Sequence, residues 1–310
     1  MTDAQAWPSG GAPAAMVVEA VRPTVDPASS LPSTDSTPGS VRVRSAFEAA
    51  RRDGRIGLIP YVVAGYPDLA TSERIALAAI DAGADLLEIG LPYSDPLADG
   101  ATLQRASSAA LRAGQTLGRS LELVERLHAA RPATPLVPMA YVNQVVGRGD
   151  PGVPMRRLAA AGASACILAD LTPDEGAPVE RAAVDAGLGV VYLVTPTTAA
   201  ERRTWIASRT GGFLYVVSLV GVTGARAALP REVAAFVREV RSLSPVPVAV
   251  GFGVSRPAHV RRLARVADGV IVASALVDAL GPDGRDVTAL AGLVRSLRAA
   301  TAIAPAIRAR

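Results

Sequence analysis

The sequence predicts an α/β protein: a (β/α)8 barrel of the TIM type, preceded by an extra helix and a disordered tail. From residue 41 onward, eight short apolar runs alternate with amphipathic segments. This part of the chain has about 270 residues, close to the ~250 that such a barrel takes. The alternative is an open, doubly wound sheet, but no GxGxxG motif follows the first predicted strand.

Residues 1–40 differ in composition from the rest of the chain. They hold six prolines, many serines and threonines, one arginine and four acids, without hydrophobic periodicity. We therefore expect a disordered tail over 1–40 and a single barrel domain over 41–310. The tail lacks the apolar run of a secretory signal and the arginines of a transit peptide. No segment reaches the ~18 apolar residues of a membrane span, so a cytoplasmic protein is expected.

Each predicted element follows from a local pattern. The segment 41–53 should form the extra helix. Segment 69–83 is typical of the helices between strands, with apolar residues at i, i+3 and i+4 and a terminal glycine. Another helix near 287–300 should close the chain. The predicted strands are 56–64, 86–90, 136–140, 165–170, 189–194, 213–218, 248–252 and 269–273.

The amino-acid composition excludes several kinds of chemistry. All 32 basic residues are arginine, which excludes a Schiff-base aldolase, a resident pyridoxal phosphate and a Walker phosphate loop, since each needs a lysine. The histidines are His128 and His259, both in helix-like segments, and Cys166 is the single cysteine. A zinc site, a histidine-based triad and an intrachain disulfide are therefore not expected. Carboxylates, tyrosines, hydroxyls and backbone groups must carry any catalysis.

Nucleic acid is not an expected partner. The net charge is +4, but the arginines are scattered along helices, and aromatic residues make up only 4% of the chain. Few stacking platforms are therefore available.

Three carboxylates crowd into EIGLPYSDPLADG, residues 88–100. Because side chains alternate across a strand, Glu88 faces either the barrel interior or the helices and is buried in both cases. It is either a general acid/base with a raised pKa or a structural group paired with an arginine. Asp95 suits a turn residue. Asp99 is either a helix N-cap or a second site carboxylate at the barrel mouth.

Small residues follow the last three predicted strands. Gly224 lies in the loop after strand six, Gly253 after strand seven, and Ser274 after strand eight, where a helix begins. Backbone N–H groups and a serine hydroxyl can hold a phosphate without any lysine. The pattern favours a phosphomonoester substrate. The alternative is tight packing between helix and strand.

Three more polar residues lie on or after strands. Asn143 and Asp170 follow strands three and four, and we expect them to bond to each other or to the loop after strand two. Tyr215 lies within strand six. Its phenol either faces the pocket or is a half-buried core ring.

These segments resemble the α subunit of tryptophan synthase over roughly residues 44–300. GADLLEIGLPYSDPLADG is the most specific stretch. In order along the chain, the supporting motifs are PYVVAGYPD, MAYVN, ADLTPDE, PTTAAERRTWIASRTGGFLYVVSLVGVTGAR, GFGVS and GVIVASALV. Members of this family fold as a (β/α)8 barrel and cleave indole-3-glycerol phosphate to indole and glyceraldehyde 3-phosphate.

The resemblance implies a role for each candidate residue. Glu88 would be the acid/base and Asp99 the partner of the indole N–H. Tyr215 would line the substrate pocket, and three residues would hold the phosphate: Gly224, Gly253 and Ser274. No metal or organic cofactor is implied. A β subunit that carries pyridoxal phosphate would be the partner, in an αββα heterotetramer, with Pro92 and Asp95 at the contact.

The chain departs from the family pattern at three positions. Ala273 replaces a glycine beside the phosphate, and Ala101 and Thr172 replace prolines. A stand-alone lyase that releases free indole and a non-catalytic partner that activates a β subunit therefore stay open. So does another phosphosugar isomerase or lyase on the same barrel, because the fold alone does not fix function.

Overall fold

The computed structural model describes residues 33–147, 149–217, 231–251 and 253–303. Nine strands form one parallel sheet in the order β5-β4-β3-β2-β1-β9-β8-β7-β6. The first and last strands in this order, β5 and β6, are separated in the sequence by Tyr192 alone. They are two halves of one strand, and the sheet therefore closes on itself. The predicted (β/α)8 barrel is confirmed. The strands are β1 (Gly57–Val63), β2 (Leu87–Gly90), β3 (Leu136–Ala140), β4 (Ala165–Leu168), β5 (Gly189–Val191), β6 (Leu193–Val194), β7 (Leu214–Val217), β8 (Val248–Gly251) and β9 (Gly269–Val272).

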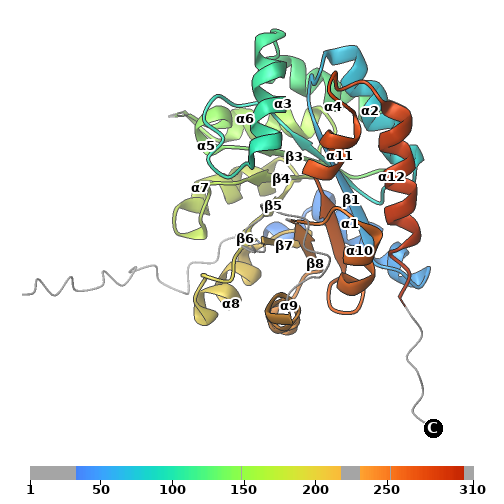
Figure 1. The fold of residues 1–310 in the computed structure, drawn as a ribbon. Helices are drawn as coiled ribbons and strands as arrows, with labels where there is room; N and C mark the ends of the chain where they lie inside the picture. Colours follow the sequence, from blue (N-terminus) through green and yellow to red (C-terminus); the bar gives the residue numbers. More distant parts are fainter. Residues whose placement is uncertain (1–32, 148, 218–230, 252, 304–310) are drawn as a thin grey trace, which may run out of the picture. The chain divides into compact units, whose positions relative to one another are not determined.

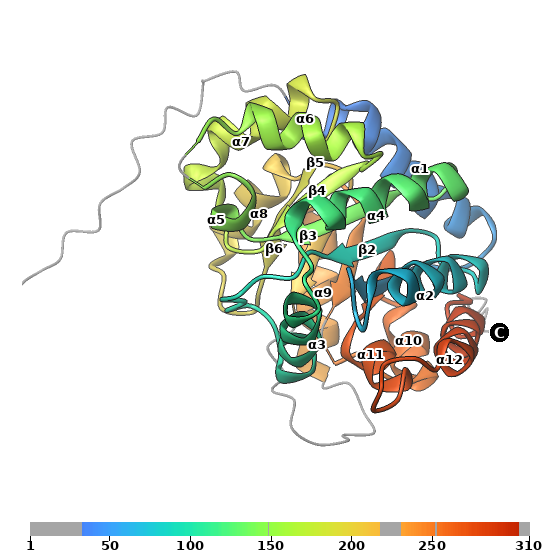
Figure 2. The ribbon, with the colours of Figure 1, turned by 90° about the horizontal axis from the view of Figure 1, so that it is seen from above.

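Helices surround these strands in both ribbon views, Figure 1 and Figure 2. The first turn, η1, lies where the sequence predicted tail, and α1 begins at Pro38 rather than at residue 41. The helical elements are η1 (Thr34–Ser36), α1 (Pro38–Arg52), α2 (Leu69–Asp81), α3 (Ala101–Arg112), α4 (Leu117–Ala130), α5 (Val142–Val145), α6 (Gly152–Ala160), α7 (Pro173–Asp185), α8 (Ala200–Arg209), α9 (Arg231–Leu243), α10 (Pro257–Leu263), α11 (Ser274–Ala279) and α12 (Val287–Ala299). Within the described ranges, no helix is long and apolar enough to cross a membrane.

Two apolar cores account for the near-continuous apolar strands. One lies between the strands and the surrounding helices, and the other fills the barrel. A parallel sheet buried on both faces needs apolar residues at successive positions. This is why the strands are visible in the sequence as uninterrupted runs.

Helix α1 seals one end of the barrel. Its Val43 and Phe47 belong to the inner core, and the rings of Phe47 and Phe213 lie 5.7 Å apart. A Cβ on Gly57 or Gly269, the first residues of β1 and β9, would approach the Phe47 ring to 3.2 Å or 2.6 Å. These glycines make room for the ring at the amino-terminal ends of the strands, and the opposite end stays available for a site.

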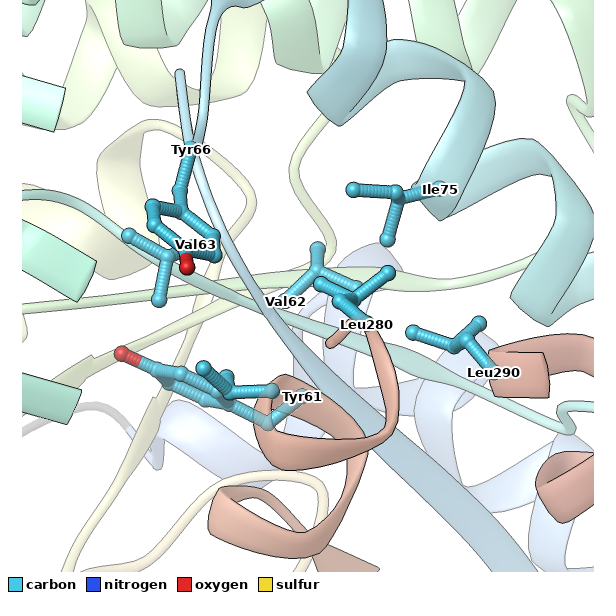
Figure 3. A pocket seen from close by; sticks show the side chains of 8 residues that line it. Tyr61, Val62, Val63, Tyr66, Ile75, Leu280 and Leu290 are labelled. Carbon is cyan, nitrogen blue, oxygen red and sulfur yellow. The ribbon is translucent and has the colours of Figure 1, made fainter. Parts of the chain in front are cut away.

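A small cavity lies behind β1, against α2, α11 and α12. Figure 3 shows Tyr61 and Tyr66 on one side of it and Ile75, Leu280 and Leu290 on the other. No charged side chain lines this cavity. Apart from Tyr61 and Tyr66, the side chains that line it are aliphatic, and the active sites of (β/α)8 barrels lie instead at the carboxyl ends of the strands.

Candidate active site

Strand β2 places Glu88 inside the barrel. Its neighbour Leu86 belongs to the inner core, whereas Leu87 and Ile89 belong to the outer one. Glu88 is 1% exposed, and both carboxyl oxygens are buried without a hydrogen-bond partner in the described part of the chain. A pairing with an arginine from this part is therefore ruled out. Burial and the charge of Asp99 raise the pKa of Glu88 from 4.5 to about 8.

Asp99 lies in the strand-two loop, residues 91–100, which connects β2 to α3. The N-cap of α3 is Gly100, without a side-chain cap, so the N-cap interpretation of Asp99 is wrong. Burial raises the pKa of Asp99 from 3.8 to about 6, against the opposing effect of hydrogen bonding to Tyr141. Near pH 7, the site therefore holds a mostly protonated Glu88 beside a mostly ionised Asp99.

Two further tyrosines face this pair. Tyr215 on β7 is half-buried, and a Cβ on Gly251 would lie 2.3 Å from its hydroxyl. Likewise, a Cβ on Gly90 would lie 1.8 Å from the hydroxyl of Tyr61 on β1. Burial, together with the charges of the two carboxylates, raises the pKa of each phenol well above 10. Both therefore stay neutral hydrogen-bonding groups. Sequence reasoning missed Tyr61, although its place one strand away from Glu88 was readable from the strand order.

Two of the three predicted phosphate residues, Gly253 and Ser274, lie at neighbouring strand ends. Gly253 follows β8 with a positive φ of 74°, and space is open around its missing side chain. Ser274 is the exposed first residue of α11, directly after β9. Ala273 is half-buried and packs against a core cluster that includes Tyr61. Gly224 lies outside the described residues.

The loops after β3 and β4 hold the remaining polar residues. Asp170 accepts a 2.8 Å hydrogen bond from the Val142 N–H, and the Asn143 side chain donates to the Tyr93 hydroxyl at 3.1 Å. Asn143 and Asp170 were expected to bond either to each other or to the strand-two loop. The structure shows a bond to the loop, and Asn143 makes it. Asp95 is exposed, and the Ser94 hydroxyl donates to its carboxylate at 2.5 Å, as suits a turn residue.

Across the described ranges, no group of three or more histidine, cysteine, aspartate or glutamate side chains could hold a metal ion. Acid/base and electrostatic effects are what the assembled groups can supply.

A (β/α)8 barrel with two carboxyl groups brought together at the carboxyl ends of its strands has the architecture of a TIM-barrel enzyme. The comparisons with known proteins make the class specific. The family model of the tryptophan synthase alpha chain matches residues 47–301. The chain belongs to this family, and it is a lyase.

Relatives and solved structures agree with this membership. The chain is 43% identical to the tryptophan synthase alpha chain of Roseiflexus sp. (strain RS-1), over 83% of this chain and 99% of the relative. The relative from Deinococcus radiodurans is also 43% identical, over 84% and 95%. Tryptophan synthase from M. tuberculosis superposes with a TM-score of 0.78 at 37% identity, covering 85% of this chain and 99% of that one. The alpha subunit from Legionella pneumophila gives 0.77 at 32%, covering 84% and 98%.

Proposed function

We propose that this chain cleaves indole-3-glycerol phosphate to indole and glyceraldehyde 3-phosphate, with Glu88 as the acid/base and Asp99 as the electrostatic partner. One observation carries the proposal. Glu88 is a buried carboxyl group without a hydrogen-bond partner among the described residues, beside a second carboxylate. Structural carboxylates are usually paired, whereas catalytic ones are held ready for substrate.

The retro-aldol reaction uses this pair in sequence. Protonated Glu88 gives its proton to C3 of the indole ring, which leaves an indoleninium cation. Asp99 accepts a hydrogen bond from the ring N–H and stabilises this positive charge. The Glu88 carboxylate then takes the proton of the side-chain hydroxyl next to the ring. The carbon–carbon bond breaks, its electron pair neutralises the ring, and an aldehyde forms. Glu88 ends protonated again.

The phosphate would anchor the far end of the substrate. Gly253 and Ser274 follow the adjacent strands β8 and β9 and would bind it through backbone N–H and hydroxyl groups, with Gly224 as the third contributor. Tyr215 would line the pocket between the phosphate and the carboxyl groups. Binding energy from the phosphate would hold the reacting carbon near Glu88.

A β subunit is the proposed partner, in an αββα assembly in the cytoplasm. The strand-two loop offers it a surface, because Leu97 is 94% exposed. The lack of lysine in this chain leaves the pyridoxal phosphate chemistry to that partner. Two departures from the family pattern lie where helices begin. Ala101 is the first residue of α3, and Thr172 is the N-cap of α7, where its side chain makes no cap hydrogen bond. Measuring indole formation with and without β separates the heterotetrameric enzyme from a stand-alone lyase.

The direct test is Glu88→Gln. The amide has nearly the same shape but cannot exchange protons. Indole release should fall by at least about 10²–10⁴-fold, while substrate binding and the folded structure persist. Indole is measured from indole-3-glycerol phosphate with and without a β chain, and folding by circular dichroism.

Glu48→Gln is the matched control, because Glu48 lies on α1, is 64% exposed and belongs to the sealed end of the barrel. It should keep wild-type activity. Wild-type turnover in Glu88→Gln would refute the acid/base role. A wild-type chain that binds β tightly yet forms no indole, alone or in the complex, would establish the non-catalytic alternative.

A further inference from the structure

Tyr141 contacts the strand-two loop beside Asp99. It directly follows β3, its side chain is buried, and its hydroxyl accepts a 3.0 Å hydrogen bond from the Ala98 N–H. Ala98 precedes Asp99 in the chain. The contact therefore fixes the backbone at the entry to the aspartate.

The Tyr141 hydroxyl has one hydrogen-bonding capacity left beside Asp99, which directly follows the Ala98 that it already contacts. A phenol has one O–H donor, and the bond from Ala98 uses its oxygen as an acceptor, so the proton is left to donate. Hydrogen bonding between Tyr141 and Asp99 lowers the pKa of the carboxyl group. Burial and the charge of Asp99 hold the pKa of Tyr141 well above 10, which keeps this proton on the phenol.

Two further contacts hold the loop against α5. The Tyr93 ring stacks on the Tyr141 ring, with centroids 5.2 Å apart and planes at 27°. The side-chain amide of Gln144 donates to the carbonyls of Pro92 and Leu91, at 2.8 Å and 3.3 Å. The loop is thus fixed at its start by Gln144 and near its end by Tyr141.

We propose that Tyr141 is a positioning residue for the lyase reaction, which aims the Asp99 carboxylate at the indole N–H and keeps it ionised. The inference rests on the proposed function and adds a residue to it. Tyr141 does not touch the reacting atoms and acts through Asp99 alone.

The neighbours of Asp99 come from four strands and their loops. Glu88 faces it from β2, and the phenols of Tyr61 and Tyr215 face it from β1 and β7. On the α3 side, the Gln104 amide donates to the Asp99 backbone carbonyl and leaves the carboxylate to Tyr141. Asp170 adds a further negative charge near Tyr141. In this acidic surrounding, a hydrogen-bond donor is what favours the anion.

The test is Tyr141→Phe in the full-length chain, with kcat/KM for indole release measured from pH 5 to 9. The wild type should lose activity below about pH 6, where Asp99 becomes protonated. The variant's acid limb should lie about one pH unit higher. Activity at pH 5.5 should then fall about tenfold relative to wild type, and far less at pH 7.5.

Tyr93→Phe is the control. It keeps the stacked ring and removes a hydroxyl that contacts Asn143, so its acid limb should coincide with that of the wild type. Superimposable profiles for Tyr141→Phe and wild type would overturn the inference, and so would an equal loss at every pH, which a purely structural role predicts.

Carboxyl ¹³C NMR titration of Asp99 in the free protein tests the same point without turnover. The Asp99 pKa should rise in Tyr141→Phe and stay unchanged in Tyr93→Phe. If the titration shifts while wild type releases no indole, the proposed reaction fails but the effect of Tyr141 on Asp99 stands. An Asp99 pKa that is equal in all three proteins would refute the inference itself.

Discussion

At the scale of single residues, Glu88 combines two properties that rarely coexist in a stable fold. It is carried on a strand whose other residues are buried and apolar, and no described group bonds to its oxygens. Burying an ionised carboxylate is costly, so the group is held neutral instead. Burying Glu88 therefore lowers the stability of the folded protein at neutral pH. In return, the site holds a protonated carboxyl group that can donate a proton at that pH.

This loss predicts a pH dependence of folding stability. The folded-state pKa of Glu88, about 8, exceeds its ordinary value of 4.5. Between these values, unfolding releases a proton, so the free energy of unfolding falls as pH rises, by at most about 1.4 kcal/mol per pH unit. Glu88→Gln lacks this slope. Urea unfolding at pH 5.5 and 7.5 should show the variant gaining about 2 kcal/mol relative to wild type over the interval.

Glu48→Gln should show no such gain, because the Glu48 side chain is exposed to water. If the difference in unfolding free energy between Glu88→Gln and wild type does not change with pH, then Glu88 is not a neutral buried acid.

The residues of the site were predictable to different degrees. Glu88 was visible as a charge inside an apolar strand, and the loop after it drew attention to Asp99. Tyr141 and Tyr61 were not assigned roles, because a tyrosine in an apolar segment is also an ordinary core residue. A tyrosine of the site differs from a core tyrosine in the group that its hydroxyl contacts, and that contact depends on the register between strands.

At the scale of elements, the fifth strand of the barrel is broken at Tyr192, between β5 and β6. Its hydroxyl points outward and donates to Glu180 on α7 at 2.7 Å. Glu180 is 1% exposed and pairs with Arg209 at the end of α8. The Tyr192 carbonyl accepts from the Tyr215 N–H at 3.0 Å. The break therefore links a buried ion pair to the strand that carries Tyr215.

Removing one partner of this pair should be strongly destabilising. Arg209→Met leaves the Glu180 carboxylate buried with only the Tyr192 hydroxyl, and breaking a buried pair in this way costs about 3–5 kcal/mol. Urea unfolding at pH 7 measures the loss. The double variant with Glu180→Gln should recover much of it, because no unpaired charge remains. A single variant as stable as wild type would show that water already reaches the pair.

Element boundaries were predictable where hydrophobicity changes and not elsewhere. The strand ends fall within a few residues of the predicted ranges, since buried parallel strands are uninterrupted apolar runs. The break at Tyr192 was not predicted, because tyrosine continues an apolar run and Glu180, which its hydroxyl contacts, lies twelve residues away. The pattern of one segment cannot show a partner on another.

At the scale of the whole barrel, its two ends have different duties. The carboxyl ends of the strands hold the carboxyl pair, and the amino ends are closed by α1. Directly before α1 lies η1, which the sequence analysis assigned to the tail because its serine, threonine and proline composition resembles a linker. Tertiary contacts override that composition. The Thr34 hydroxyl donates to the Arg209 carbonyl at 2.8 Å, and the Asp35 carboxylate accepts from the Gly212 N–H at 3.1 Å.

Two truncations should therefore behave differently. Deleting residues 1–32 keeps every described element, and the family match begins only at residue 47, so stability and indole release should be unchanged. Deleting 1–37 also removes η1 and the Thr37 side chain, which caps α1 through a 3.1 Å bond from the Ser40 N–H. The lost cap and buried hydrogen bonds should cost about 2–4 kcal/mol.

Thermal unfolding compares the two chains. Because η1 lies at the sealed end, the longer deletion should lower the melting temperature but leave kcat at 25 °C near that of wild type. Equal melting temperatures would mean that α1 closes the barrel without η1.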